Sequence, residues 1–305
     1  MRLLFPHHRA SRRQAPESSL EAFTDEAVVK SPVEVELKGH FSVDGIVPNC
    51  ACTFMYGTDP DYIDQSFPSF VNEKDNTSLS ITATLPQIGV TYYYKVKVKV
   101  VVDGGVVESE GEVKSFKVPG PTASNPIDLG GGVQWAAYNV GAGSPEQFGY
   151  YFMWGETAER STWPQSPSPY TEVPSVLPSD KDAATANLGS SWRMPTRDEF
   201  EALGDYCVAY KTSFRNKNGI LFVSKKNGNS MFLPSAGYYY GTNDSMGKIC
   251  NYWSASPAKE STSAFASALY VYTNLGNGIL PQIVSPPFVS DKNRAYGAPV
   301  RPVKK

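Results

Sequence analysis

The chain has 305 residues, more than one hydrophobic core usually holds, and this length predicts two domains. Its 28 lysines and arginines nearly balance its 30 aspartates and glutamates, so the formal charge is only -2. This balance argues against a nucleic-acid partner. No stretch approaches the roughly 20 apolar residues that a membrane-spanning helix needs, so we expect no transmembrane segment.

Charged residues make up only 19% of the chain, whereas 18 tyrosines, 15 phenylalanines, 25 glycines and 24 prolines favour short strands joined by turns. The predicted class is therefore mostly β. The three histidines, His7, His8 and His40, all precede the predicted second domain, which thus lacks the residue most used for acid–base chemistry. We expect a protein that is not an enzyme and holds no cofactor.

Residues 1–30 are rich in basic, then acidic and small side chains, and predict a disordered or extended tail. The alternation of Val33, Val35 and Leu37 with charged residues predicts a half-buried strand. A second alternation, in Tyr92–Val102, sets tyrosine and valines against lysines. Strands at regular spacing without helices predict an antiparallel β-sandwich over 31–119, followed by a proline-rich linker at 120–126.

The predicted second domain, 127–305, combines aromatic strands with two short helices, so its class is α+β. Ser179 and Asp180 predict the cap of a helix that continues to Asn187. Thr196 followed three residues later by Glu199 is the capping-box pattern, and it predicts a second helix that ends near residue 206.

Four cysteines are too few for a disulfide scaffold. Cys50 and Cys52 fall on one face of a strand, where two small core residues are the favoured interpretation. Cys207 and Cys250 could pair in an oxidising compartment, and burial as free thiols fits the sequence equally well. The spacing of the cysteines predicts no metal site.

Two stretches of the chain resemble known families. The string from Leu85 to Tyr94 resembles the turn-and-strand signature of fibronectin type III-like domains, which implies a spacer. A longer ordered set of strings resembles the FISUMP-type major paralogous domain, found on the surfaces of Bacteroidetes-like bacteria. These strings are Asp128-Leu129-Gly130, Trp135-Ala136, Asn139-Val140-Gly141-Ala142, Trp154-Gly155-Glu156, Asp182-Ala183-Ala184-Thr185-Ala186-Asn187, Trp192-Arg193-Met194-Pro195-Thr196, Glu199-Phe200, Phe232-Leu233-Pro234-Ser235-Ala236-Gly237, Tyr252-Trp253-Ser254-Ala255-Ser256 and Val300-Arg301-Pro302-Val303.

The fold of that family is similar to the superfold of C-type lectins and the formylglycine-generating enzyme. The resemblance implies an extracellular or outer-membrane protein. Since the apolar run near Met1 is too short for a signal peptide, export would need a signal upstream of this start.

Most of the matched residues are expected to be structural. Large aromatic groups beside glycines and small residues predict core positions for Trp135, Trp154, Trp192 and Trp253. Arg193 and Arg301 lie in apolar strings, and we expect them to form buried or half-buried ion pairs with Glu156 or Glu199.

Ligand binding is expected in the long C-terminal loop region that the superfold presents, here about Pro257 to Tyr296. For any single tyrosine of Ala268 to Thr273, the core or rim of a strand is the favoured interpretation, and the expectation rests on the cluster. Aromatic and amide groups of this kind contact sugars by stacking and hydrogen bonding, or proteins through hot spots. The candidate ligand-binding residues are Tyr238, Tyr239, Tyr240, Asn243, Tyr270, Tyr272, Asn274, Asn277 and Tyr296. Calcium-mediated sugar binding is not expected because the lectin strings for it are absent, although a calcium site at Asn243 and Asp244 stays open.

The function predicted from these features is non-catalytic recognition or adhesion at the cell surface, with a glycan or a surface protein as partner. One alternative is a structural surface or pilus-tip subunit that assembles with envelope proteins and binds no soluble ligand. A remote alternative is an oxidase like the formylglycine-generating enzyme. That chemistry needs paired cysteines late in the domain, and no cysteine follows Cys250.

Overall fold

The computed structural model describes residues 19–44, 48–73, 75–102, 105–163, 165–260, 263–273 and 282–304. Strands make up 45% of the structure and helices 7%, which confirms the predicted mostly-β class. The described residues form two compact units: the first lies within 1–28, 36–83 and 92–116, and the second comprises 29–35, 84–91 and 117–305. Each unit is described by itself.

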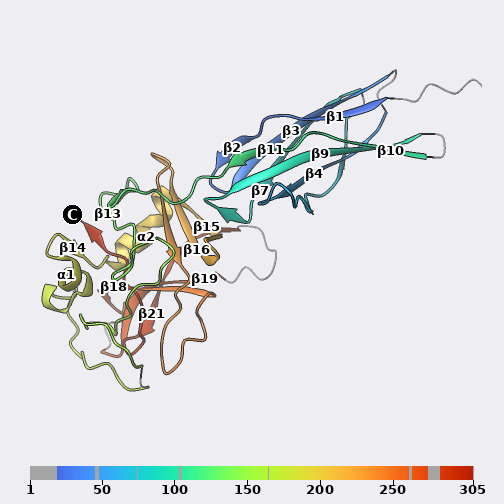
Figure 1. Cartoon of the computed structure of the whole chain (residues 1–305). Helices are drawn as coiled ribbons and strands as arrows, with labels where there is room; N and C mark the ends of the chain where they lie inside the picture. The colour runs from blue at the N-terminus through green and yellow to red at the C-terminus, as the bar shows by residue number, and fades with distance from the viewer. Residues whose placement is uncertain are drawn as a thin grey trace, which may run out of the picture. The chain divides into compact units, whose positions relative to one another are not determined.

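The segment predicted as a β-sandwich forms two sheets (Figure 1). One has the order β1-β3-β2 with β7 also on β3, and its strands are β1 (Leu20–Thr24), β2 (Val28–Ser31), β3 (Glu34–Val43) and β7 (Ser78–Thr84). The other has the order β10-β9-β4-β5, with β11 on β9 and β6 on β4. Its strands are β4 (Ala51–Gly57), β5 (Gln65–Ser66), β6 (Phe70–Val71), β9 (Thr91–Val102), β10 (Gly105–Glu110) and β11 (Lys114–Lys117).

The alternation in β9 has the predicted effect. The buried side chains of β9 alternate with lysines on the opposite face, and they are Tyr92, Tyr94, Val96, Val98 and Val100. There Lys97 Nζ lies 2.7 Å from a carboxylate oxygen of Glu108 and 3.2 Å from one of Glu110, both on the neighbouring strand β10. The tail predicted for residues 1–30, in contrast, includes residues that form a strand. Strand β1 already begins at Leu20, and buried and less buried side chains alternate along it as in the later strands.

The second unit contains three sheets. The first has the order β12-β13-β22-β14, from β12 (Ile127–Asp128), β13 (Gln134–Trp135), β14 (Trp192–Arg193) and β22 (Val303–Lys304). The second has the order β17-β16-β15-β20, from β15 (Cys207–Phe214), β16 (Lys217–Ser224), β17 (Ser230–Pro234) and β20 (Gln282–Val284), and β8 (Gln87–Ile88) pairs with β15 in parallel. The third is β18-β19-β21, from β18 (Ile249–Pro257), β19 (Phe265–Tyr272) and β21 (Val289–Asn293).

Two α-helices occur in the described residues, α1 (Ala183–Leu188) and α2 (Arg197–Tyr206). Helix α2 begins at the predicted cap: the Thr196 side chain accepts from the backbone N of Glu199, and the Glu199 carboxylate accepts from the backbone N of Thr196. The predicted cap of the first helix was wrong, because a short turn lies between the predicted residues and the helix. Ser179–Lys181 forms a 3-10 turn, and Asp182 caps α1 because its carboxylate accepts from the backbone N atoms of Thr185 and Met194, both at 2.9 Å.

The predicted core tryptophans are mostly confirmed. Trp135, Trp154 and Trp253 are fully buried, and the indole nitrogens of the latter two donate to the backbone oxygens of Ser254 and Phe152. Trp192 is only half-buried, on the two-residue strand β14. A fifth tryptophan, Trp163, was not singled out, yet it is buried in a small aromatic cluster.

The two predicted ion pairs have different outcomes. Arg193 and Glu199 form the expected pair, with Nη1 and Nη2 each donating to one carboxylate oxygen at 2.7 and 2.5 Å. Glu156 instead pairs with Arg160. Arg301 has no acidic partner among the described residues, and its fully buried guanidinium donates only to neutral oxygens.

Candidate functional site

The predicted tyrosine string, Tyr238 to Tyr240, lies in the segment between β17 and β18, where successive side chains point to opposite sides. The backbone N and O of Tyr239 both bond to Gly297, at 2.8 Å each, which holds this segment in an extended conformation. Successive side chains of an extended chain point to opposite sides. Tyr239 therefore points inward and stacks on Trp163, with ring centroids 5.5 Å apart, while Tyr238 and Tyr240 lie on the other side.

Tyr238 and Tyr240 meet Tyr296, which follows β21. The rings of Tyr238 and Tyr296 are stacked, with centroids 4.4 Å apart and planes at 15°, and Tyr240 is tilted against Tyr296 at 5.5 Å. These three rings line an open hollow of about 340 Å³ together with Asp244 and Lys248. We call this hollow the tyrosine pocket.

The neighbouring sheet adds a fourth tyrosine to the cluster. Burial, and the proximity of Tyr238 and Tyr296, raise the pKa of Tyr270 on β19. The ammonium of Lys292 on β21 lies 3.2 Å from the centroid of its ring, which is a cation–π contact. Tyr272 lies two residues further along β19 and is 53% exposed.

The structure assigns different surroundings to the other candidate residues. The side chain of Asn243 forms hydrogen bonds within its own segment. Its Nδ2 donates to Ala236 O at 3.0 Å, and its Oδ1 accepts from Ser245 Oγ at 3.2 Å. A Cβ on Gly237 would lie 2.4 Å from this Oδ1, so the close approach requires glycine there. Asn274 and Asn277 lie outside the described residues.

The region predicted as one long loop, 257–296, contains much of the third sheet. Strands β19 and β21 pair in register, with Ala268 opposite Ser290, and β20 pairs with β15. The predicted loop was therefore wrong for these residues. The small and aromatic side chains of β19 alternate, which is a strand pattern. Ala266 and Ala268 are the buried members of this pattern in the core.

Sequence reasoning missed Asn251, on β18. It lies opposite Tyr270 in the strand register and is fully buried, yet neither its Nδ2 nor its Oδ1 has a hydrogen-bond partner. A buried amide without partners is costly, so such a group needs an explanation. The signal in the sequence is a single polar residue in the otherwise apolar string Ile249–Trp253.

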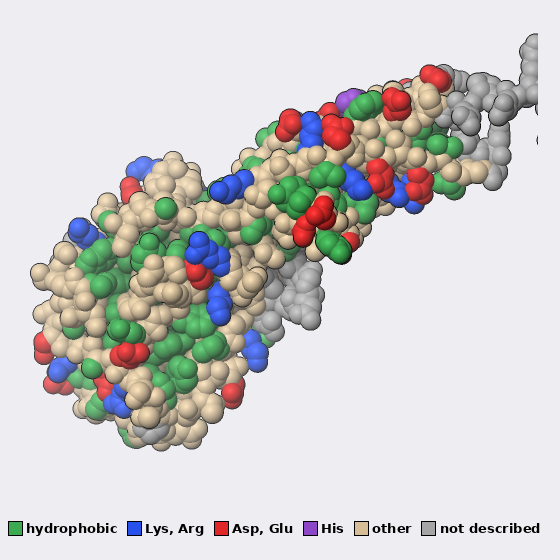
Figure 2. All heavy atoms as spheres, in the orientation of Figure 1, with side chains coloured by type: hydrophobic (Ala, Val, Ile, Leu, Met, Phe, Trp, Pro, Cys, Tyr) green, Lys and Arg blue, Asp and Glu red, His purple; other side chains and the backbone are tan. Residues whose placement is uncertain are grey.

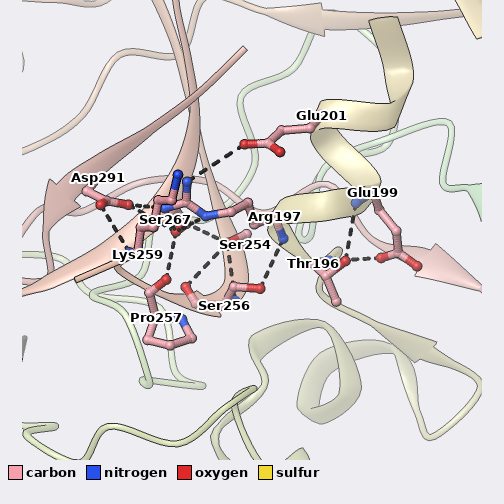
Figure 3. Close-up of polar contacts among 10 residues, drawn as sticks. All are labelled: Thr196, Arg197, Glu199, Glu201, Ser254, Ser256, Pro257, Lys259, Ser267 and Asp291. Carbon is pink, nitrogen blue, oxygen red and sulfur yellow. Dashed lines mark hydrogen bonds and ion pairs between the residues drawn. The ribbon is translucent and has the colours of Figure 1, made fainter. Parts of the chain in front are cut away.

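A polar network ties this sheet to the start of α2 (Figure 3). Arg197 donates through Nε to Ser267 Oγ at 2.9 Å and pairs with Asp291, so one side chain links α2 to β19 and β21. Ser267 Oγ also lies 2.7 Å from Pro257 O, and the backbone N of Lys259 donates to Asp291 at 3.1 Å. This network fixes the two strands that carry Tyr270 and Lys292.

The structure places all four cysteines as buried free thiols, so the disulfide considered for Cys207 and Cys250 is not formed. Burial raises the pKa of both thiols to about 12, which leaves them protonated at neutral pH. Within the described part of the chain, no three or more His, Cys, Asp or Glu side chains are grouped so that they could hold a metal ion. None of the described helices is both long and apolar enough to cross a membrane.

Charges are dispersed over the visible face. Figure 2 shows lysines and arginines among aspartates and glutamates, with apolar groups between them, on the described residues of that face. Near the tyrosine pocket the charges are likewise mixed, since Asp244 and Lys248 line the same hollow. A ligand there meets aromatic faces and single charges rather than a field of one sign.

Comparisons with known proteins give little further information. No family model matches the chain, and none of the curated proteins matches it. One solved structure is similar over 36% of this chain and 92% of its own length: the sensor domain of the anti-sigma factor RsgI4 from Pseudobacteroides cellulosolvens. The identity is 16% and the TM-score is 0.26, so this likeness carries no argument about fold or function.

Proposed function

We propose that this chain is a non-catalytic recognition protein of the cell surface that binds a glycan in the tyrosine pocket. The observation that carries the proposal is the group of three tyrosines, Tyr238, Tyr240 and Tyr296, around one open hollow. Half-buried aromatic rings offer apolar faces for the C–H side of a sugar, and their hydroxyls offer hydrogen bonds at the rim.

The pocket is preorganised by hydrogen bonds within its own wall. The backbone N of Tyr238 donates to Ser245 Oγ at 3.1 Å, and the backbone N of Gly237 donates to Ile249 O at 2.8 Å. Stacking already holds the Tyr296 ring against Tyr238. Binding therefore costs little side-chain entropy, which favours affinity for a weakly held ligand such as a sugar.

The surface location rests on the resemblance to FISUMP-type domains, and in this proposal the β-rich first unit serves as a fibronectin-like spacer. A purely structural role, as a pilus-tip or envelope subunit, is the competing proposal. A structural role requires neither particular side chains in the tyrosine pocket nor a soluble ligand, so a binding experiment separates the two proposals.

The test is a glycan array probed with the full chain, followed by titration of any hit. We expect Tyr238→Ala and Tyr240→Ala to reduce binding about fivefold each, since stacking on an aromatic ring is worth about 1 kcal/mol. The matched control is Tyr62→Ala, because Tyr62 is 72% exposed and lies in the first unit. Its binding should equal that of the parent chain.

Thermal unfolding of each variant shows whether its fold survives. A glycan that binds the folded pocket variants and the parent equally would refute the site. If no glycan binds the parent chain, but it co-purifies with surface polymers, the structural role replaces this proposal.

A further inference from the structure

One arginine of the second unit lacks the partners that the others have. The described residues include six arginines, of which Arg160, Arg193, Arg197 and Arg215 each pair with a carboxylate. Arg301 has no acid but places its donors on four oxygen atoms. Arg294 alone has neither an acidic partner nor a full set of hydrogen bonds among the described residues.

Arg294 is fully buried, and its guanidinium is fixed on two sides. Nε donates to Phe265 O at 3.0 Å, Nη1 donates to Glu172 O at 2.6 Å, and Cζ lies 4.1 Å from the centroid of the Trp154 ring. Nη2 has no hydrogen-bond partner. A buried cation without a counter-ion is costly, and consistent with this, burial lowers the pKa of Arg294.

Arg294 stands in the wall of a second hollow, of about 330 Å³. The other walls carry hydroxyl, amide and small groups, among them Ser168, Thr171, Ser263 and Asn293, and no acidic side chain. Such a lining accepts an anion without repulsion and can donate hydrogen bonds to it. We call it the arginine hollow.

The wall beside Arg294 is held loosely. Ser168 Oγ makes a 3.5 Å contact with Trp154 O and accepts from the backbone N of Tyr170 at 3.3 Å, both at the long limit of hydrogen bonding. Nη2 itself is buried, so a ligand anion must displace a side chain of this wall to reach it. Because Nε and Nη1 are already used, we expect one charge-assisted hydrogen bond rather than a bidentate pair.

Tyr240 lines both the arginine hollow and the tyrosine pocket. A ligand that stacks at Tyr240 can therefore place a substituent in either hollow. The tyrosine pocket contains both Asp244 and Lys248, whose charges offset each other, whereas the lining of the arginine hollow carries only the cation.

We propose that the arginine hollow binds the carboxylate of an acidic sugar, so that the glycan recognised by this protein carries a uronic-type acid. This inference rests on the proposed glycan function and specifies its substrate class. Arg294 supplies the charge, and Tyr240 holds the sugar ring that joins the two hollows.

The experiment titrates the full chain with sodium glucuronate, with glucose as the neutral match and with sodium acetate and sodium sulfate as free anions, at low salt. We expect glucuronate to bind at least about tenfold more tightly than glucose, because one charge-assisted hydrogen bond is gained. In Arg294→Met this advantage should disappear. Equal affinities for glucuronate and glucose in the parent chain would overturn the inference.

A second variant guards against loss of the fold in Arg294→Met. Ser168→Asp places a carboxylate of the chain itself at the wall of the arginine hollow, where it can pair with Arg294. We expect a higher melting temperature, loss of the glucuronate advantage and unchanged glucose binding. Glucuronate that still binds Ser168→Asp tenfold more tightly than glucose would contradict the assignment.

The outcomes also separate the two proposals. Neutral sugars that bind through the tyrosines, with no preference for glucuronate, would overturn the acidic-sugar inference and leave the glycan function standing. Acetate, sulfate and glucuronate that all raise the melting temperature equally, and only when Arg294 is present, would support an anion site while overturning the glycan function.

Discussion

Removal of the Arg301 guanidinium should cost a large part of the stability of the second unit. Its Nε donates to Asn139 Oδ1 at 2.8 Å, Nη1 to Ala136 O and Ala137 O at 3.1 and 2.9 Å, and Nη2 to Phe232 O at 2.9 Å. Arg301→Met removes these donors from four acceptors. Each buried group left unsatisfied costs about 1–3 kcal/mol.

Relief of the buried charge offsets part of that cost, since burial lowers the pKa of Arg301 to about 10. We therefore expect Arg301→Met to lower the free energy of unfolding by about 4 kcal/mol, against a total of about 5–15 kcal/mol for a natural domain. Arg301→Lys should lose roughly half as much, because one ammonium cannot reach four separated acceptors.

The assay is urea unfolding followed by tryptophan fluorescence. All five tryptophans lie between Trp135 and Trp253, so the signal reports on the second unit alone. The matched control is Arg160→Met, whose ion pair with Glu156 is partly exposed and should be worth about 0–1 kcal/mol. A loss in Arg301→Met no larger than in this control would refute the reasoning.

Four further results are expected. Thr196→Ala should cost about 1 kcal/mol through loss of the α2 cap, measured by the same unfolding, and an unchanged midpoint would contradict the capping box. Burial disfavours the charged form of Glu199, but the hydrogen bonds from Arg193 and Thr196 outweigh it and hold the pKa of this carboxylate below its usual 4.5. The carboxylate therefore stabilises the fold above pH 4.5, and that contribution is lost as the pH falls through the lowered pKa. Glu199→Gln should flatten this acid limb of a plot of melting temperature against pH, and a limb of unchanged slope would exclude the pair as its source. A thiol reagent should label none of the four cysteines in the native protein and all four in urea without a reductant, whereas two in urea would reveal a disulfide. Asn251→Leu should raise the melting temperature by a few degrees, because it removes two unsatisfied buried atoms, and a fall would show that the amide has a partner.

Local patterns were the predictable part of this fold. The two-residue alternation of Val33, Val35 and Leu37 and the capping box at Thr196 both depend on neighbours within a few residues, and both were confirmed. The pair between Arg193 and Glu199 spans six residues and was also foreseen.

Contacts that join distant segments were not predictable in the same way. The four acceptors of Arg301 come from two different segments, the farthest 165 residues away, and nothing in the sequence near Arg301 indicates them. The meeting of Tyr238 with Tyr296 depends equally on how the third sheet folds back. Tyr239 shares the same string, yet only the backbone pairing with Gly297 shows that it faces inward.

The pairing of β22 with β13 and β14 has a consequence for synthesis. Val303 lies opposite Trp135 on one side and Arg193 on the other, so β22 completes a sheet whose other strands lie far earlier in the chain. Contacts of such long sequence separation form slowly, because a long loop must close before they contribute. On the ribosome, a nascent chain whose β22 has not yet left the exit tunnel would lack the strand that pairs with Trp135.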